Sequence, residues 1–489
     1  MATVTLVNLN LVRVPAIGPY AIDVLGSALE ARGHQVSVLD LTREADGIDA
    51  IDRYFAAHRP DILALSMRNH FDLYFPSLGR RADHGSFLAS HARVIEKLKR
   101  HASSDRIVIG GVGFSTAPFQ LLERFGLHTG VRGPGEEVLP LLCDAVDRGL
   151  SFDGMKYPKL ERGKLQVFDG RRAKLSRRVR RKFVDNRWYY EYGGLGNLRA
   201  SSGCSMRCGY CVEPYAKGGS FSKANVENIL LELDELVEMG IYDVQTADSE
   251  FNMPLPHSKQ LLRGIIERRY PKQFRLWAYI QPSPFDAEYA ELLAQAGVPG
   301  VNVGTDHTDP TVLAAMNKWF TLQEVAQMTK LCRSQGIAVM HELLFGYPGD
   351  NPEKMYRALD DLRALDPTVI GVTIGMGVLE GTALGNLLRE RLSSGAPLDG
   401  FHLAGEPFVE PAYFVDPSFR IPEVYSDLEQ FVGKDVSYIM IPKVNAAVDT
   451  DNQLVDSERI RAQLHEEKKK GAYWFHYAPT RAQLHSARS

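Results

Sequence analysis

Cysteine is scarce in this chain, with 5 in 489 residues, and nothing in the sequence indicates secretion. No run of about 18 apolar residues occurs, which excludes an ordinary membrane-spanning helix. The amino terminus begins directly as a strand, without a charged-then-apolar signal segment. A formal net charge of −3 gives no electrostatic basis for nucleic-acid binding. We therefore expect a cytoplasmic protein of two or three domains, without a nucleic-acid or membrane partner.

Three of the five cysteines fall within eight positions, as Cys204, Cys208 and Cys211. Soft thiolate ligands in one loop select an iron–sulfur or a zinc site. Structural zinc normally takes four ligands, and no second Cys or His pair follows at finger-like spacing. Three cysteines this close also cannot pair fully as disulfides. The spacing predicts a 4Fe–4S cluster in which one iron has no thiolate and is open to a small molecule.

The spacing Cys-x3-Cys-x-aromatic-Cys, with Tyr210 as the aromatic residue, resembles the radical S-adenosylmethionine (SAM) superfamily. In that family the open iron chelates the amino and carboxylate groups of SAM. The resemblance implies that the three cysteines are both metal ligands and catalytic residues. It also implies SAM as a cofactor and an external electron donor such as flavodoxin or ferredoxin.

Residues 1–150 alternate strands with helices, which predicts a Rossmann-like, doubly wound parallel sheet. A helix is expected over 19–32, with Gly33 at its C-terminal end. The expected strands are 4–7, 36–39, 61–66, 106–111 and 130–133. Ligands of such sheets sit beyond the carboxyl ends of the strands. In this chain that edge carries Asn8, Ser66, Gly110 and Gly111.

This half resembles the cobalamin-binding domain that precedes some radical SAM modules. The resemblance is carried by Gly33-His34, Ser66, Gly110-Gly111 and the segment 132–137. It implies cobalamin contacts at Asn8, Ser66, Gly110, Gly111 and Gly133. The Asp-x-His-x-x-Gly loop is absent after the first strand, so cobalamin without a histidine on cobalt is expected. The bulky segment 67–76 either caps a corrin or fills the space that a corrin would take.

Residues 151–195 are expected to form a connector. Its basic run, 171–182, is interpreted as a solvated face, with binding of a carboxylate or oxyanion substrate as the alternative. The aromatic cluster 188–192 is expected to pack at the mouth of the following domain.

Over residues 196–390 the alternation resumes and predicts a partial (β/α)6 barrel, with its active site at the carboxyl ends of the strands. The expected strands are 197–202, 242–247, 274–280, 300–304, 337–345 and 369–374, and an amphipathic helix is expected over 226–238.

Four segments after these strands resemble SAM-contacting loops of the family. Residues 248–252 stand in place of Gly-Gly-Glu, 304–307 in place of Gly-x-Glu, and 345–350 in place of Gly-x-Pro-Gly-Glu. Residues 377–384 match a further segment, with glycine at the usual arginine, and Asn317-Lys318 resembles a helix segment of the family. The resemblance implies SAM contacts at Tyr210, Asp248, Ser249, Glu250, Thr305, Asp306, Gly346 and Pro348.

Four residues outside these motifs are assigned structural roles. His307 and His341 lie near strand ends and are expected to be hydrogen-bonded inside the fold, with contact to substrate as the alternative. Cys143 and Cys332 lie in apolar helical patterns and are expected to be buried. Residues 391–489 are expected to form a small α+β extension, with a strand over 435–442 and a helix over 456–470, that covers the barrel mouth and carries substrate specificity.

The first functional hypothesis is a cobalamin-dependent radical SAM methyltransferase that reductively cleaves SAM and acts on a small natural-product precursor. The second is transfer of a 3-amino-3-carboxypropyl group, which resembles the step proposed for arsinothricin biosynthesis with trivalent arsenic as acceptor. The third is a non-catalytic carrier of a cluster or of cobalamin.

Overall fold

The computed structural model describes residues 1–11, 16–71, 86–432, 438–441 and 463–476. The chain divides into two compact units. The first comprises residues 1–71, 86–206 and 212–241, and the second comprises 72–85, 207–211 and 242–489. No helix among the described residues is long and apolar enough to cross a membrane.

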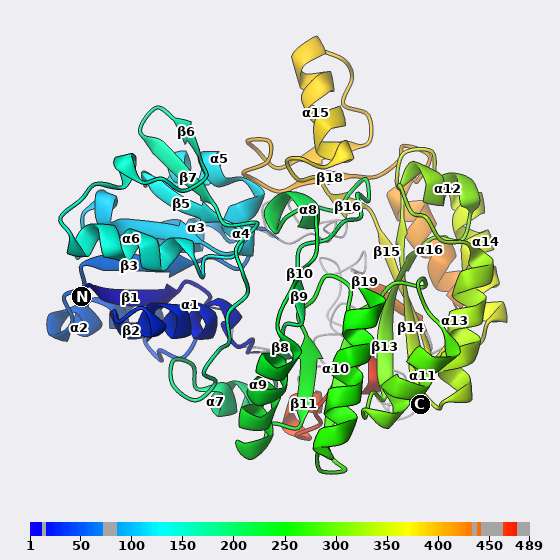
Figure 1. The fold of residues 1–489 in the computed structure, drawn as a ribbon. Coiled ribbons are helices and arrows are strands. Elements are labelled where there is room, and N and C mark those ends of the chain that lie inside the picture. The colour runs from blue at the N-terminus through cyan, green and yellow to red at the C-terminus, as the bar shows by residue number, and fades with distance from the viewer. Residues whose placement is uncertain (12–15, 72–85, 433–437, 442–462, 477–489) are drawn as a thin grey trace. The chain divides into compact units, whose positions relative to one another are not determined.

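The first unit contains a seven-stranded sheet in the order β2-β1-β3-β4-β5-β7-β6 (Figure 1). All neighbouring strands are parallel except β6 and β7. The first five strands have the order of a doubly wound sheet, in which the chain changes direction beside β1. The strands are β1 (Thr3–Asn8), β2 (Gln35–Asp40), β3 (Ile62–Ser66), β4 (Ile107–Gly110), β5 (Thr129–Arg132), β6 (Lys159–Arg162) and β7 (Leu165–Asp169).

Helices α1 and α6 contact each other and bury their apolar sides in one core on the sheet. Cys143 of α6 is part of this core, as its apolar surroundings predicted. Helix α1 ends before Gly33, whose φ of +85° is the left-handed conformation that favours glycine. The helices of this sheet are α1 (Tyr20–Ala31), α2 (Ala50–Ala57), α3 (Leu88–Leu98), α4 (Val112–Thr116), α5 (Pro118–Phe125) and α6 (Val138–Asp147).

The connector differs from the sequence expectation in its first part, because β6 and β7 extend the sheet. Strand β7 pairs parallel with β5, and its Val167 and Phe168 are buried. Strands β6 and β7 are short alternations of apolar and polar residues with charged residues on either side. The composition of this segment is therefore typical of a polar linker.

The basic run is only in part the solvated face that was expected. Five of its eight basic residues are exposed (Arg172, Lys174, Arg177, Arg181 and Lys182), whereas two are buried. The side chains of Arg178 and Arg180 are 2% and 0% exposed. The backbone N–H of Arg178 donates to Glu232 at 2.8 Å and its guanidinium forms an ion pair with the same carboxylate. Arg180 lies 3.4 Å from the Asp23 carboxylate. Buried charges require such partners, and these partners come from helices distant in the sequence.

The aromatic cluster of the connector also packs on the first unit. The Tyr189 hydroxyl donates to Asp40 at the end of β2 at 2.7 Å, and Trp188 packs against the core under α1. The remaining elements of this unit are α7 (Asn186–Glu191), β8 (Gly196–Leu198), β9 (Ser201–Ser202), α8 (Glu213–Ala216), β10 (Ser222–Lys223) and α9 (Val226–Glu238). The strand expected over 197–202 is therefore divided into β8 and β9.

The second unit is built on parallel strands that follow one another in chain order from β11 to β15, as in a partial barrel. A further strand, β19, pairs parallel with β15. This strand comes from the carboxyl-terminal segment, where a strand was predicted. The strands are β11 (Asp243–Thr246), β12 (Arg275–Ile280), β13 (Gly300–Asp306), β14 (Ala338–Phe345), β15 (Val369–Ile374) and β19 (Tyr438–Ile441).

Helices alternate with these strands, and the predicted fold class is confirmed. The buried Cys332 lies in α13, as expected. The helices of this unit are α10 (Leu255–Arg268), α11 (Ala287–Gln295), α12 (Pro310–Ala315), α13 (Leu322–Ser334), α14 (Pro352–Ala364), α15 (Ala383–Ser394) and α16 (Ile421–Val432).

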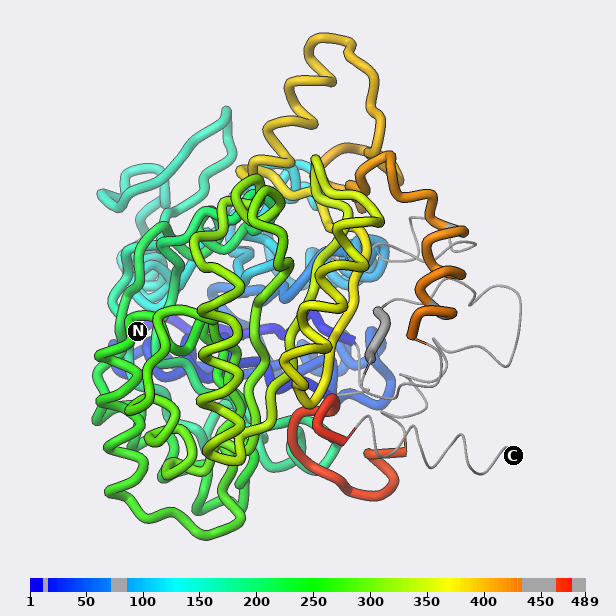
Figure 2. The backbone as a smooth tube through the Cα atoms, turned by 90° about the vertical axis from the view of Figure 1, so that its right-hand side faces the viewer, coloured from blue at the N-terminus to red at the C-terminus, as the bar shows by residue number. Residues whose placement is uncertain are grey.

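The described parts of the carboxyl-terminal region lie at opposite ends of this barrel (Figure 2). A three-stranded antiparallel sheet of β16 (Met376–Gly377), β18 (Ala412–Phe414) and β17 (Phe401–Leu403) follows β15. Residues 463–476 instead pack at the amino-terminal ends of the strands, where Trp474 donates to Asn302 at 2.6 Å. That segment therefore closes the end opposite the expected mouth. Residues 456–462 of the predicted helix lie outside the described residues.

Candidate active site

The cysteine loop is held by backbone hydrogen bonds on both sides. Within the first unit, the Cys204 N–H donates to Gly218 at 3.0 Å. Within the second, the Cys211 N–H donates to the Cys208 carbonyl, also at 3.0 Å. Cys204 and Cys208 are 4% and 7% exposed, and Cys211 is half-buried. None of the three forms a disulfide within the described part of the chain, and thiols are soft metal ligands.

Segments after three strands of the second unit anchor the middle of this loop. The Gly209 N–H donates to Met316 at 2.9 Å, and the Gly209 carbonyl accepts from Leu384 at 3.1 Å. The Asn317 amide donates to the Arg207 carbonyl at 2.8 Å. Tyr347 packs on the same glycine. The loop is therefore positioned by the ends of the barrel strands, where the active site of such a barrel is expected.

A buried ion pair lies beside the loop. The Lys318 ammonium is 2.7 Å from the Asp306 carboxylate, which also accepts from the Tyr210 hydroxyl. Burial alone would lower the pKa of Lys318, but attraction by Asp306 and Cys208 outweighs it and raises that pKa. Burial raises the pKa of the Cys208 thiol, and the nearby Lys318 cation opposes this shift. Lys318 thus favours the thiolate form that binds iron.

The segment after β11 brings a second carboxylate to the same region. Glu250 accepts from the Gln281 amide at 2.6 Å, and both side chains are buried. The side-chain carbonyl oxygen of Gln281, Oε1, has no hydrogen-bond partner among the described residues. Asp248 is buried and Ser249 half-buried beside Glu250 in the same segment. Glu250 and Gln281 together offer acceptor oxygens to a cationic ligand.

The structure does not bring the Thr305 side chain to this region. Its hydroxyl is 0% exposed and lies 2.7 Å from the His341 ring, whose other nitrogen lies 2.9 Å from Thr329 of α13. His307 lies 3.3 Å from Asp350 and accepts the N–H of Thr308. Both histidines therefore have the hydrogen-bonded structural role that was predicted.

The turn after β14 has its backbone groups already engaged. The Gly346 N–H donates to Asp350 at 2.8 Å, and its carbonyl accepts from Asp416 at 2.7 Å. Gly346 has a φ of +88°, which favours glycine. Pro348 lies two residues further on, in the same turn.

Three of the residues implied for cobalamin form one row at the carboxyl edge of the first unit's sheet. Asn8 is paired in register with Ser66, and Ser66 with Gly110. The Asn8 amide donates to Asp40 at 2.8 Å and to Thr42 at 3.1 Å, so this side chain is already used internally. Ser66 keeps part of its surface exposed. This row lies beside β1, where doubly wound sheets bind ligands.

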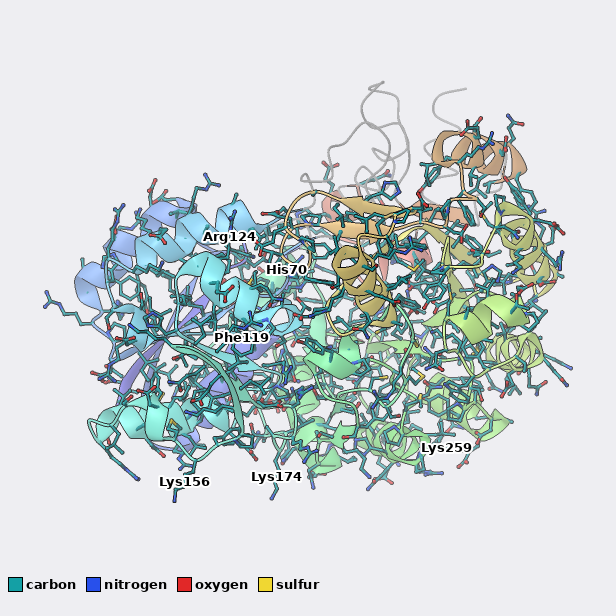
Figure 3. All side chains as sticks on the ribbon, turned by 90° about the horizontal axis from the view of Figure 1, so that it is seen from above. His70, Phe119, Arg124, Lys156, Lys174 and Lys259 are labelled. Carbon is teal, nitrogen blue, oxygen red and sulfur yellow. The ribbon has the colours of Figure 1, made fainter. Side chains whose placement is uncertain are left out.

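Gly111 and Gly133 pack so closely against other residues of the protein that a side chain at either position would clash with them. A Cβ at Gly111 would lie 2.3 Å from the Met67 carbonyl oxygen, and one at Gly133 would lie 3.0 Å from the Arg171 nitrogen. The segment after Ser66 also packs inward, since the His70 ring lies 3.2 Å from the Thr116 hydroxyl (Figure 3). Residues 72–76 of the bulky segment lie outside the described residues.

The family model described as radical SAM superfamily matches residues 198–362, and the one described as B12 binding domain matches residues 10–142. Tryptophan 2-C-methyltransferase of Streptomyces laurentii is 32% identical over 99% of this chain and 97% of its own length. This chain belongs to the B12-binding radical SAM methyltransferases.

Two solved structures resemble this chain along most of its length. That of the radical SAM methyltransferase TsrM from Kitasatospora setae, with tryptophan substrate and a SAM analogue bound, matches with a TM-score of 0.89 and 32% identity, over 100% of this chain and 99% of that one. The cobalamin-dependent SAM radical enzyme OxsB matches with a TM-score of 0.65 at 16% identity, over 88% of this chain and 67% of that one, and shows the fold alone. The predicted family and the transferase class are thus confirmed.

Sequence reasoning missed three side chains of this methyltransferase that face the same region: Gln281, Glu342 and Tyr347. In β14 the partly exposed Glu342 lies between two buried residues, His341 and Leu343, so burial alternates along this part of the strand. That alternation was a usable signal, because a carboxylate on the inner face of a barrel strand requires a partner. The contact of Tyr347 with Gly209 left no signal in the sequence.

Proposed function

We propose that this enzyme transfers a methyl group from SAM, by way of cobalamin, to carbon 2 of an indole substrate of the tryptophan type. The observation that carries the proposal is the similarity to tryptophan 2-C-methyltransferase along nearly the whole chain. The match to TsrM with tryptophan bound supports the same substrate class. These relatives favour methyl transfer over aminocarboxypropyl transfer and over a carrier role.

The three thiols at 204, 208 and 211 fit a 4Fe–4S cluster, since they form no disulfide among the described residues, are largely buried and lie in one anchored loop. Among the described residues no three His, Cys, Asp or Glu side chains converge on a single metal ion. A cluster of this kind differs from such a site because each thiolate binds a different iron. We propose that a reduced flavodoxin or ferredoxin supplies electrons to it.

The carboxyl edge of the first unit's sheet fits cobalamin at its partly exposed position, Ser66. The side chain is small and lies between Asn8 and Gly110 in register, at the ligand-binding edge of a doubly wound sheet. The segment between β1 and α1, residues 9–19, includes no histidine, which agrees with the expectation of cobalamin without a histidine on cobalt.

When bound, the cluster supplies an iron with a free position for SAM, and cobalamin supplies a carrier for the methyl group. The residues of the chain itself orient the bound groups and supply charged or polar partners to them. Glu250 and Gln281 offer acceptors to the SAM ammonium, and Tyr210 is fixed beside the cysteines by Asp306. Orientation of the bound groups is the main contribution that such residues make to the rate.

The test is anaerobic reconstitution with iron, sulfide and cobalamin, followed by incubation with SAM and tryptophan. The proposal predicts 2-methyltryptophan, and it predicts that Cys208→Ala loses both cluster iron and activity. Cys332→Ala is the matched control, because Cys332 is a buried cysteine of α13. The control is expected to keep its iron.

The position of cobalamin is tested separately with Ser66→Leu. The larger side chain is expected to lower cobalamin content while cluster iron stays at the wild-type level. Methylthioadenosine as the main product would contradict methyl transfer, and the absence of any methylated indole would contradict the substrate class.

A further inference from the structure

We propose that Glu342 binds the ammonium group of the amino-acid substrate and thereby selects it over indoles that lack an amine. This inference rests on the proposed function, because it takes the substrate to be of the tryptophan type. Neither the similarity to relatives nor the family motifs assigned a role to this residue.

Glu342 lies in the middle of β14, on the face opposite to His341. His341 is buried toward α13, where its ring lies 2.9 Å from Thr329. Successive side chains of a strand point to opposite faces, so Glu342 projects into the barrel interior. The Asn302 amide of the neighbouring β13 donates to the Glu342 carboxylate at 2.9 Å, which agrees with this direction.

The surroundings of Glu342 carry more negative than positive charge. Burial holds the pKa of the Tyr279 phenol well above its ordinary value, and the carboxylates of Glu342, Glu250 and Asp306 raise it further. In the described part of this cluster the cation is Lys318, and it pairs with Asp306. Glu342 forms no ion pair with any residue that the structure describes. A carboxylate in such a place is stabilised as an anion when a ligand supplies a cation.

The carboxylate also has capacity left for a donor. It accepts from Asn302 and from the Tyr279 hydroxyl, whereas an ionised carboxylate has about four acceptor sites. Glu342 and Tyr279 both keep part of their surface exposed. Asn302 is itself fixed by Trp474 at 2.6 Å, so the first of these bonds orients the carboxylate rigidly. Glu342 is therefore held in place and reachable. Burial raises the pKa of its carboxyl, and a cationic ligand beside it would favour the ionised form.

The experiment measures binding of two ligands to the anaerobic holoenzyme by equilibrium dialysis: tryptophan, and indole-3-propionate, which lacks the ammonium group. Glu342→Gln keeps the shape and removes the charge. The proposal predicts that the Kd for tryptophan rises about 10- to 100-fold in this variant, as for loss of a hydrogen bond to a charged group. The Kd for indole-3-propionate is expected to stay within about twofold, since it lacks the bond that is lost.

Glu390→Gln is the control, because Glu390 is exposed on α15 and its loss changes the net charge by the same amount. It is expected to bind both ligands as the wild type does. Glu342→Asp keeps the charge but shortens the side chain by one methylene. We expect this variant to lose an intermediate amount of affinity for tryptophan and none for indole-3-propionate. This second variant also decides the matter if Glu342→Gln does not fold.

Equal affinity of wild type and variant for tryptophan would overturn the inference, and so would an equal loss for both ligands, which indicates a merely structural role. Failure of the proposed function is separate, because it would appear as absence of methylated indole with the wild-type enzyme. In steady-state assays the inference predicts a raised KM with a smaller change in kcat.

Discussion

The hydroxyl of Tyr347 occupies the space in which a side chain at Gly209 would lie. A Cβ at Gly209 would be 1.9 Å from the Tyr347 oxygen, far inside van der Waals contact. Gly209 is the residue directly after Cys208, and Tyr347 belongs to the turn after β14. The shape of the cysteine loop is thus fixed by a residue about 140 positions further along the chain.

Gly209→Ala is therefore expected to displace the loop and lower the iron bound per chain several-fold, because overpacking of this kind costs about 1–3 kcal/mol. Iron and sulfide analysis after anaerobic reconstitution measures the effect. Gly209→Ala combined with Tyr347→Ala should recover much of the iron. Gly154→Ala is the control, since a Cβ there meets nothing within 4 Å. Normal iron content in Gly209→Ala would refute the role of this contact.

Lys318→Met is expected to destabilise the enzyme by about 3–5 kcal/mol, because it leaves the Asp306 carboxylate buried without its cation. Thermal unfolding of the anaerobic protein measures the loss. Lys330→Met, at an exposed position of α13, should change stability by less than about 0.5 kcal/mol. The double variant Asp306→Asn with Lys318→Met should recover part of the loss. An additive double variant would show that the two residues do not interact.

Two neighbouring arginines of the connector, Arg177 and Arg178, allow the stability contribution of a surface ion pair to be compared with that of a buried one. Arg178→Met should cost about 3–5 kcal/mol, because Glu232 would remain buried and unpaired. Arg177→Met removes a pair with Glu235 in which the arginine is 41% exposed, and should cost less than about 1 kcal/mol. Denaturant unfolding measures both. Equal losses in the two variants would contradict the burial argument.

His341 makes stability depend on pH. Burial lowers the pKa of this histidine from 6.5 to about 3. The folded state therefore favours the neutral ring, and the resulting stabilisation is complete above about pH 6.5 and is lost as the pH falls toward 3. His341→Gln should be less stable than the wild type at about pH 7.5 and should lose less stability between that pH and about pH 5.

The slope that His341 contributes is at most about 1.4 kcal/mol per pH unit, the value for one proton. Denaturant midpoints measured across this range test it. His58→Gln, at an exposed position of the first unit, is the control and should follow the wild-type slope. An unchanged slope in His341→Gln would show that another group takes up the proton.

Much of the fold followed from local patterns. The strand expected over 369–374 is β15, and the helix expected over 226–238 is α9, each with the expected bounds. Alternation of strands and helices determined both parallel sheets, because short-range periodicity reflects which face is buried. The spacing of Cys204, Cys208 and Cys211 was enough to indicate the cofactor chemistry.

The errors arose where burial depends on distant partners. Arg178 and Arg180 belong to a basic run that was expected to be solvated. Their partners, Glu232 and Asp23, lie 54 and 157 positions away in the sequence. The direction of the Thr305 side chain was likewise not predictable from its segment: its hydroxyl lies beside His341, because strand residues alternate between faces. No local pattern encodes such pairings.

By itself the sequence determined the ligand chemistry and the order of elements, since three closely spaced thiols and a repeated strand–helix period are local properties of the chain. Only the tertiary structure decided which polar side chains face one another: Lys318 with Asp306, Glu250 with Gln281, Glu342 with Asn302. The pairs of Glu250 and Glu342 join segments from neighbouring strands, whereas Lys318 follows Asp306 by 12 positions in the segment after β13. The physical reason is that the free energy of a buried charge depends on what folding places within a few ångströms of it.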